Sequence, residues 1–140
     1  MEPQSAQRTA ETNKNQDNFP LRDITEKIIA CAIEVHSALG PGLLESVYEE
    51  ALEHEFQIRQ IRYEKQKEIN LVYKERKIGK HRIDFLVENE VVLELKAVES
   101  MHKIFEAQVL TYLKAMRKHV GLLINFNVLR LKDGIKRLIN

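Results

Sequence analysis

The chain has 140 residues, of which 44% are hydrophobic and 31% are charged. This length excludes two domains with separate full-sized cores, and this composition excludes disorder along the whole chain. The 22 Lys and Arg residues against 21 Asp and Glu leave a formal net charge of +1, so a contact with nucleic acid would need locally clustered charge.

A single cysteine, Cys31, lies among apolar residues such as Ile28 and Val35 and is expected to be part of the core. It has no second cysteine with which to form an internal disulfide, which favours a reducing, cytoplasmic compartment. No apolar run approaches the roughly 18 residues of a membrane span, and the N-terminus lacks the apolar stretch of a secretion signal. We therefore expect a soluble protein without membrane contact.

Residues 1–20 are rich in Gln, Asn, Thr and Glu and almost free of apolar side chains, so they cannot repay the entropy of their own ordering. We expect a disordered N-terminal tail there and a single domain over residues 21–140. Asp23 and Glu26 have the spacing of a capping box, which predicts a helix starting at this point.

The first predicted helix ends at Leu39, because Gly40 and the following Pro41 terminate helices. A second helix is predicted after Gly42, with apolar residues at helical spacing up to about Phe56. Two helices thus precede any predicted strand.

The hydrophobic period then changes to two, which is typical of strands. It predicts a strand over residues 69–73, a turn over 74–77, a second strand over 78–87 and a third over 91–98. Because the connections are short, these strands should form an antiparallel meander.

Helical spacing returns over residues 102–118, before the unbroken apolar run 120–126, which is typical of a buried strand. A turn then leads to a short last strand over residues 135–139. A strand, a helix and another strand imply a parallel pair, so the fold class predicted is α/β with a mixed sheet flanked by helices.

The hairpin between the second and third strands has one register that buries its apolar side chains together, since a slip of one residue moves every side chain to the other face. In this register the apolar pairs are Val87 with Val91, Phe85 with Leu93, and Ile83 with Leu95. The other face then places Asp84 directly opposite Glu94. Such partners have Cβ atoms about 4.5 to 5.5 Å apart, so two carboxylates are expected to meet.

Two opposed carboxylates repel each other and need compensation. One reading is a hard divalent cation, Mg²⁺ or Mn²⁺, with Lys96 on the same face to orient or deprotonate a water or to neutralise a phosphate. The other reading is an ordinary solvated hairpin face on which the charges partly cancel. Gln108 and Tyr112 favour the first reading, since they share one face of the helix that follows; the alternative is a surface glutamine beside a half-buried tyrosine.

Several separated motifs in one order resemble a known family. Asp84, Glu94-Leu-Lys96 and Gln108-Val-Leu-Thr-Tyr112 resemble the signature of the PD-(D/E)XK nuclease superfamily, in the version with a QxxxY helix found in RecB-type exonuclease domains. Gly42-Leu-Leu-Glu45-Ser-Val-Tyr48 spells GxxExxY and is similar to the small GxxExxY proteins of that superfamily. The resemblance covers about residues 24–139.

This resemblance implies a restriction-endonuclease-like core, with Asp84 and Glu94 as metal ligands and Lys96 as the catalytic lysine. Glu45 would match the acidic residue that an upstream helix adds to the metal site, although a carboxylate in a first helical turn is also favoured by the helix dipole alone. Ile83 stands where the signature has proline, and Glu75 stands in a turn where relatives often have glycine. Neither departure removes a catalytic group.

The sequence therefore predicts a divalent-metal-dependent nuclease acting on DNA or RNA, with Mg²⁺ or Mn²⁺ held by Glu45, Asp84 and Glu94. Gln108 and Tyr112 would position the substrate or the lysine. The alternative is a non-catalytic module that keeps the fold and binds nucleic acid or a protein. A homodimer or a larger protein partner is a further expectation, because little of the chain lies outside the core.

Overall fold

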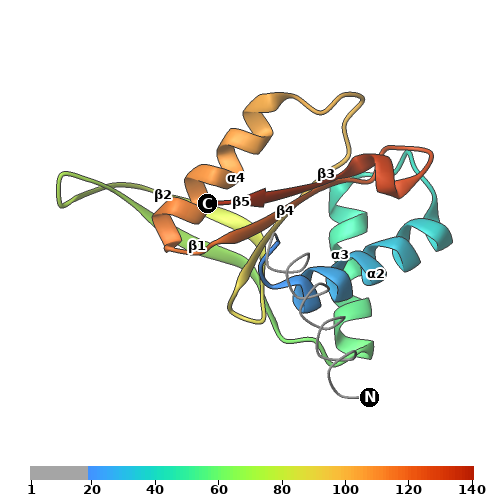
Figure 1. Cartoon of the computed structure of the whole chain (residues 1–140). Helices are drawn as coiled ribbons and strands as arrows, with labels where there is room; N and C mark the ends of the chain where they lie inside the picture. The colour runs from blue at the N-terminus through green and yellow to red at the C-terminus, as the bar shows by residue number, and fades with distance from the viewer. Residues whose placement is uncertain (1–18) are drawn as a thin grey trace, which may run out of the picture.

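The computed structural model describes residues 19–140, so nearly all of the predicted N-terminal tail lies outside the described residues. The elements in chain order are α2 (Arg22–Leu39), α3 (Glu45–Ile58), β1 (Tyr63–Tyr73), β2 (Arg76–Val87), β3 (Val91–Lys96), α4 (Lys103–Met116), β4 (Val120–Asn125), the 3₁₀ helix η1 (Leu131–Gly134) and β5 (Ile135–Ile139) (Figure 1). Within this described part no helix is both long and apolar enough to cross a membrane.

The five strands form one sheet in the order β1-β2-β3-β4-β5. β3 and β4 are parallel, as expected for strands joined through α4, and the other neighbours are antiparallel. The predicted mixed sheet with an antiparallel meander is confirmed.

The sheet separates two apolar clusters. Helices α2 and α3 pack on one face, where Phe56, Phe85 and Phe126 are fully buried. Helix α4 packs on the other face against β2, β3 and β4, where Ile83, Val92 and Leu113 are buried. Cys31 lies in the first cluster as an unpaired, buried thiol, and its burial raises the pKa to about 11. The central part of the sheet is therefore covered on both faces.

The predicted capping box is wrong. Helix α2 begins at Arg22, with Leu21 at the cap position and no side chain capping the first turn. Asp23 lies inside that turn instead, where its charge interacts favourably with the helix dipole. The predicted stop is confirmed: Gly40, in the left-handed region at φ 75°, ends the helix with its N–H bonded to the His36 carbonyl.

Strand β1 starts at Tyr63, well before the predicted start at Ile69. The early part of β1 does alternate in burial, but its more buried positions are occupied by Tyr63, Lys65 and Lys67. Because lysine stems fill positions that apolar residues usually fill, the hydrophobic pattern hides this half of the strand. At the other end of the meander, β3 stops at Lys96 rather than at Val98.

The predicted hairpin register is confirmed where the ladder exists, from Val87 opposite Val91 to Phe85 opposite Leu93. The ladder ends there, so the predicted backbone pairs beyond it are not formed. Ile83 is also not on the face of Phe85: it belongs to the cluster under α4, whereas Phe85 packs under α2 and α3. The alternation of side chains is thus broken at Asp84.

Strand β1 changes faces at the same level. Lys65 reaches the glutamates of α3, whereas Ile69 is buried in the cluster under α4. Between them Gln66, opposite Asp84, has a left-handed φ of 54°. Both strands therefore exchange faces at Gln66 and Asp84, and we call this the crossover point.

Between the crossover point and the β1–β2 turn, β1 and β2 pair only with each other. β3 pairs with β2 only at residues 85–87. The ribbon of residues 68–82, which we call the arm, ends in the turn at Lys74 and Glu75. Figure 1 shows the tip of this hairpin extending to the left of the sheet, away from α2 and α3.

Candidate active site

Tyr48 fixes the loop that leads into α3. Its hydroxyl donates to the carbonyl of Gly40 at 2.6 Å and accepts from the N–H of Leu43 at 3.1 Å. Its ring is buried and stacks on Phe126, with 4.5 Å between the ring centroids. The loop is thereby tied to the core, and Glu45 becomes the first residue of α3, exposed at the helix N-terminus. The tyrosine of the GxxExxY pattern has a structural role here.

Asp84 and Glu94 come together where the β2–β3 ladder ends. The N–H of Asp84 donates to Glu94 Oε1 at 2.9 Å, and the N–H of Leu95 donates to Asp84 Oδ2 at 2.8 Å. Carboxylate oxygens thus take the backbone donors that a ladder would use. The predicted encounter of the two residues is found, although through these bonds rather than as a backbone pair.

Burial and mutual repulsion make these acids hard to ionise. Burial raises the pKa of Glu94 to about 8, with a further increase from the charge of Asp84 and a partial decrease from Lys96. The pKa of Asp84 is raised by burial as well, against the opposing effects of the Leu95 N–H and of Gln66. At neutral pH these effects favour the protonated form of Glu94.

Glu45, the first residue of α3, interacts electrostatically with the acidic pair. The residue is exposed overall, but partial desolvation of its carboxyl raises its pKa first and the charge of Asp84 raises it second, whereas Lys96 lowers it. The structure therefore brings Glu45 close enough to interact with two of the other predicted site residues.

The sequence analysis missed Gln66 and Glu49. The amide of Gln66 donates to Asp84 Oδ1 at 3.2 Å and to Glu49 Oε2 at 2.5 Å, so it links β1, β2 and α3. Burial raises the pKa of Glu49, and the Gln66 amide opposes that increase. Gln66 could have been identified as the cross-strand partner of Asp84 by counting residue pairs back from the β1–β2 turn. That count requires knowledge of the bulge at Ile78, which shifts the register between Leu71 and Val72.

Lys96 ends β3 and is half-buried. Its Nζ lies 4.5 Å from the centroid of the Phe105 ring, a cation–π contact that holds the ammonium beside α4. The adjacent β4 residue Asn125 ties down the following loop, since its side chain bonds both the N–H and the carbonyl of Val98. The backbone around the lysine is therefore well fixed.

The two predicted residues of α4 have different environments. Tyr112 is only 8% exposed, and its hydroxyl lies 3.2 Å from Nδ1 of His81. Its pKa is raised by burial and then by the charges of Glu94 and Asp84, which places it near the acids. Gln108 is exposed and is not a partner in the hydrogen bonds of Asp84. Tyr112 therefore lies near the acids, and the Gln108 amide is exposed on α4.

The donor set can be compared with the needs of a metal ion. Within residues 19–140 no group of three or more His, Cys, Asp and Glu side chains is arranged as a metal site. The two carboxylates that do meet are hard oxygen donors, which Mg²⁺ and Mn²⁺ prefer. A cation between them would relieve the repulsion that raises the Glu94 pKa. The chemistry of the pair fits such an ion.

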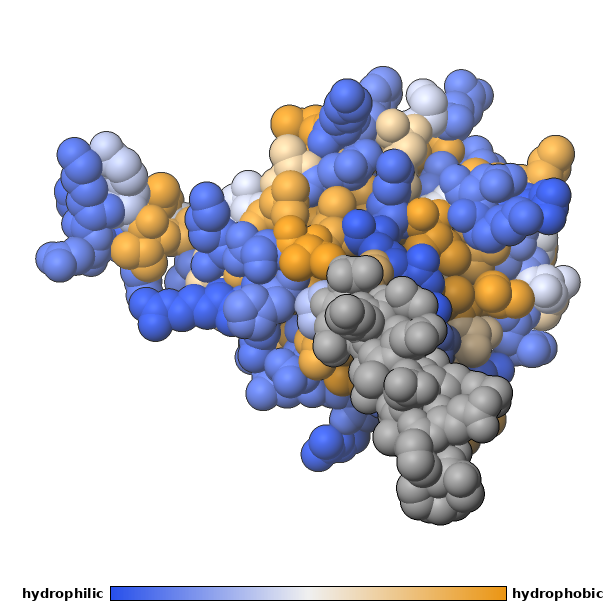
Figure 2. All heavy atoms as spheres, in the orientation of Figure 1, coloured by the Kyte–Doolittle hydropathy of each residue, from blue (hydrophilic) through white to orange (hydrophobic). Residues whose placement is uncertain are grey.

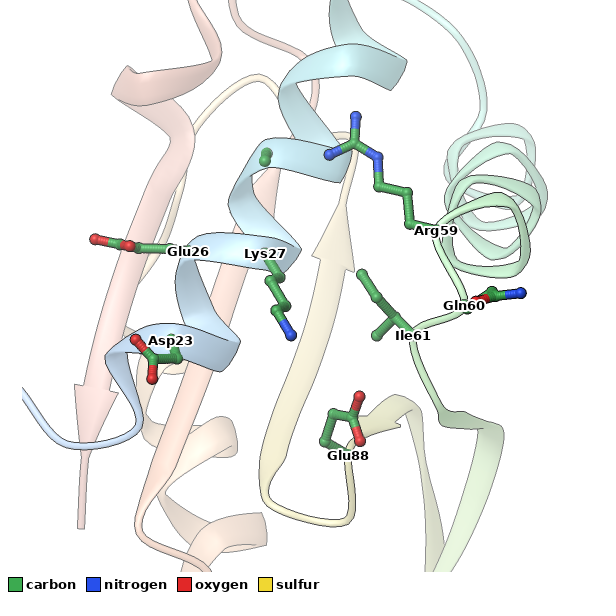
Figure 3. A pocket seen from close by; sticks show the side chains of 8 residues that line it. Asp23, Glu26, Lys27, Arg59, Gln60, Ile61 and Glu88 are labelled. Carbon is green, nitrogen blue, oxygen red and sulfur yellow. The ribbon is translucent and has the colours of Figure 1, made fainter.

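A pocket of about 500 Å³ lies elsewhere, between the start of α2, the end of α3 and the β2–β3 turn (Figure 3). Lys27, Arg59 and Glu88 are among its lining residues, and none of the predicted site residues lines it. Mixed charges on its wall indicate no particular ligand. The acidic pair lies away from the turn, toward the other end of β3.

The comparisons with known proteins agree with this fold. A family model of the PD-(D/E)XK nuclease superfamily matches residues 22–138. No curated protein and no solved structure gives a significant match. The chain belongs to the PD-(D/E)XK nuclease superfamily, and its mixed sheet flanked by helices is consistent with the restriction-endonuclease-like fold. The superfamily consists generally of nucleases that typically use divalent metal ions.

Proposed function

We propose that this protein is a divalent-metal-dependent nuclease that hydrolyses phosphodiester bonds of DNA or RNA. The observation that carries the proposal is the pair formed by Asp84 and Glu94, each bonded to a backbone N–H of the opposite strand, with Lys96 close enough to lower the pKa of both acids. An acidic pair with a neighbouring ammonium supplies the groups that metal-assisted hydrolysis requires.

In this proposal Asp84, Glu94 and Glu45 hold Mg²⁺ or Mn²⁺. When bound, the ion acts as a Lewis acid on the phosphate and supplies an activated water. Lys96 orients that water or neutralises the charge that develops on the phosphate, and the Phe105 ring keeps its ammonium at the end of β3. The hydrogen bonds of Asp84 and Glu94 keep both carboxylates from rotating during the reaction.

The finer assignment is the GxxExxY type with a QxxxY helix. We propose that exposed Gln108 offers its amide to the substrate phosphate. Tyr112 has a supporting role, because its buried ring packs in the cluster under α4 and its hydroxyl is close to His81. We also propose that residues 21–140 form one domain.

The experiment is a cleavage assay on labelled single-stranded and duplex DNA and RNA with Mg²⁺, with Mn²⁺ and with EDTA. We expect cleavage with metal only, and a loss of about 100-fold or more in Lys96→Ala, as for the removal of a group that handles a proton in the transition state. Lys103→Ala, an exposed lysine at the start of α4, is the matched control and should keep wild-type activity.

Full activity of Lys96→Ala would rule out the catalytic lysine. Binding of nucleic acid without cleavage under every condition would favour the non-catalytic module instead. The acidic pair argues against that alternative, because opposed carboxylates cost stability and a pure binding module has no use for them.

A further inference from the structure

The arm has two different faces. Cross-strand partners on one face are Ile69 with His81 and Leu71 with Gly79. This face turns toward α4, since Ile69 is buried in the cluster under α4 and His81 contacts Tyr112. The other face of the arm therefore points away from α4 and has no element packed on it in the described part of the chain.

The uncovered face carries a row of basic side chains. Its cross-strand partners are Val72 with Lys77, Asn70 with Lys80, and Glu68 with Arg82. Lys80 and Glu68 approach to 3.6 Å, which agrees with their placement on one face. Lys77, Lys80 and Arg82 are all exposed, and we call them the basic row.

Charge is concentrated in this part of the chain. Residues 68–82 contain five Lys and Arg against two Glu, a net charge of +3, whereas the whole chain carries +1. Outside the arm the chain is therefore net acidic. Figure 2 shows the projecting end as mostly hydrophilic around a small apolar patch. The exposed large hydrophobic side chains of the arm are Val72, Tyr73 and Ile78.

The basic row leads directly to the acidic pair. Arg82 lies two residues before Asp84 on β2, so the row ends next to the acidic pair. At about 3.3 Å per residue the row extends over roughly 15 Å of strand, along which a duplex presents a phosphate charge every 1.7 Å or so. Several backbone phosphates can therefore face it at once.

We infer that the basic row of the arm binds the phosphodiester backbone of a nucleic-acid duplex and guides it to Asp84 and Glu94. A ribbon of two strands also has the width that the major groove of B-form DNA accepts. The inference rests on the proposed function, since it names the surface by which that site takes its substrate. The arm favours a nucleic acid over a protein as its partner, because its net charge is positive and its exposed large hydrophobic side chains lie only near the tip.

The test measures binding without chemistry. Fluorescence anisotropy of labelled duplex DNA, duplex RNA and single-stranded DNA is recorded in EDTA, over a series of salt concentrations. The variant is Lys77→Ala/Lys80→Ala/Arg82→Ala. The slope of log K against log salt should decrease by about 2 to 3 for a duplex, at roughly 0.9 for each phosphate that the variant no longer neutralises, and affinity at low salt should fall by tenfold or more.

The matched control is Arg22→Ala/Lys27→Ala/Lys136→Ala, which removes the same charge from exposed positions on α2 and β5. It also contains one exposed ion pair, Arg22 with Glu26, as the arm contains Lys80 with Glu68. The control should keep the wild-type slope. The charge-preserving variant Lys77→Arg/Lys80→Arg/Arg82→Lys should keep it too, which separates charge from folding of the arm.

Equal slopes for the arm variant and the wild type would overturn the inference, as would equal losses in both alanine triples. Failure of the wild type to bind any duplex would overturn it as well and would favour a protein as the partner of the arm. The binding assay contains no metal and is therefore independent of cleavage. If binding depends on the arm but the separate assay with Mg²⁺ or Mn²⁺ shows no cleavage, the result counts against the proposed function alone.

Discussion

Asp84 donates its backbone N–H to the carboxylate of Glu94, while its own carboxylate accepts the N–H of Leu95, beside Glu94. Each acid is thus anchored to the strand that carries the other. Neither side chain can rotate away without leaving a part-buried donor unpaired, which would cost about 1 to 3 kcal/mol. Two groups that repel each other are thus held together by the backbone of the neighbouring strand.

Divalent ions should stabilise the folded protein, because the unfolded chain lacks the site. We expect Mg²⁺ or Mn²⁺ to raise the Tm of the wild type more than that of Asp84→Asn or Glu94→Gln, as measured by thermal melting. Glu90→Gln, at the exposed β2–β3 turn, is the control and should respond as the wild type does. Equal shifts in all four proteins would exclude a metal at the acidic pair.

Gln66 should matter for the reaction although it carries no charge. Gln66→Gly suits the left-handed φ of this position and removes the side chain whose amide holds Asp84 and Glu49. We expect cleavage to slow by about tenfold with little change in Tm, since a hydrogen bond to a charged group contributes about 1.5 kcal/mol. Gln57→Ala, which loses an amide bonded to Tyr63, should cleave normally. A drop in Tm that accounts for the whole loss would make Gln66 structural.

The metal-free protein should lose stability as the pH rises. The folded-state pKa of Glu94, about 8, lies above its ordinary value of 4.5, so the folded state binds the proton more tightly than the unfolded state does. The free energy of unfolding should therefore decline between about pH 4.5 and pH 8. Urea denaturation in EDTA over this range measures it, and Glu94→Gln should flatten the decline. An unchanged slope in that variant would remove Glu94 as its origin.

Two glycines should differ sharply when replaced by alanine. A Cβ at Gly134 would overlap the backbone carbonyl of Asn125, which cannot move without disturbing the loop that it anchors. We expect Gly134→Ala to lower the free energy of unfolding by about 3 kcal/mol, the upper end for overpacking. Gly79→Ala meets nothing within 4 Å and should change it by less than about 0.5 kcal/mol. Similar values in urea denaturation would contradict this contrast.

The apolar pattern was sufficient to predict the hairpin from Val87 and Val91 to Phe85 and Leu93, because any slip would expose buried side chains. It was therefore also sufficient to predict that Asp84 and Glu94 meet. It could not predict the first half of β1, where Lys65 and Lys67 fill the more buried positions.

The hydrophobic pattern could not predict the crossover point either, for a different reason. It depends on side chains that bond the backbone of a neighbouring strand, and hydrophobic periodicity contains no information about such bonds. This is why Ile83 was predicted on the wrong face and why Gln66 was not predicted at all. The bulge at Ile78 adds to the difficulty, since it shifts by one residue every partner counted from the turn.

The crossover point also divides the β1–β2 hairpin into a part within the sheet and the arm. On the sheet side, the positions of Phe85 and Leu93 are set by the core under α2 and α3. On the arm side, residues 71–80 contribute only partly buried or exposed side chains. Insertion or deletion of residues in matched pairs near the turn would thus change the reach of the arm while leaving the acidic pair in place. If the arm binds substrate as inferred above, its length would set the size of substrate that the protein accepts, and the acidic pair would not have to change.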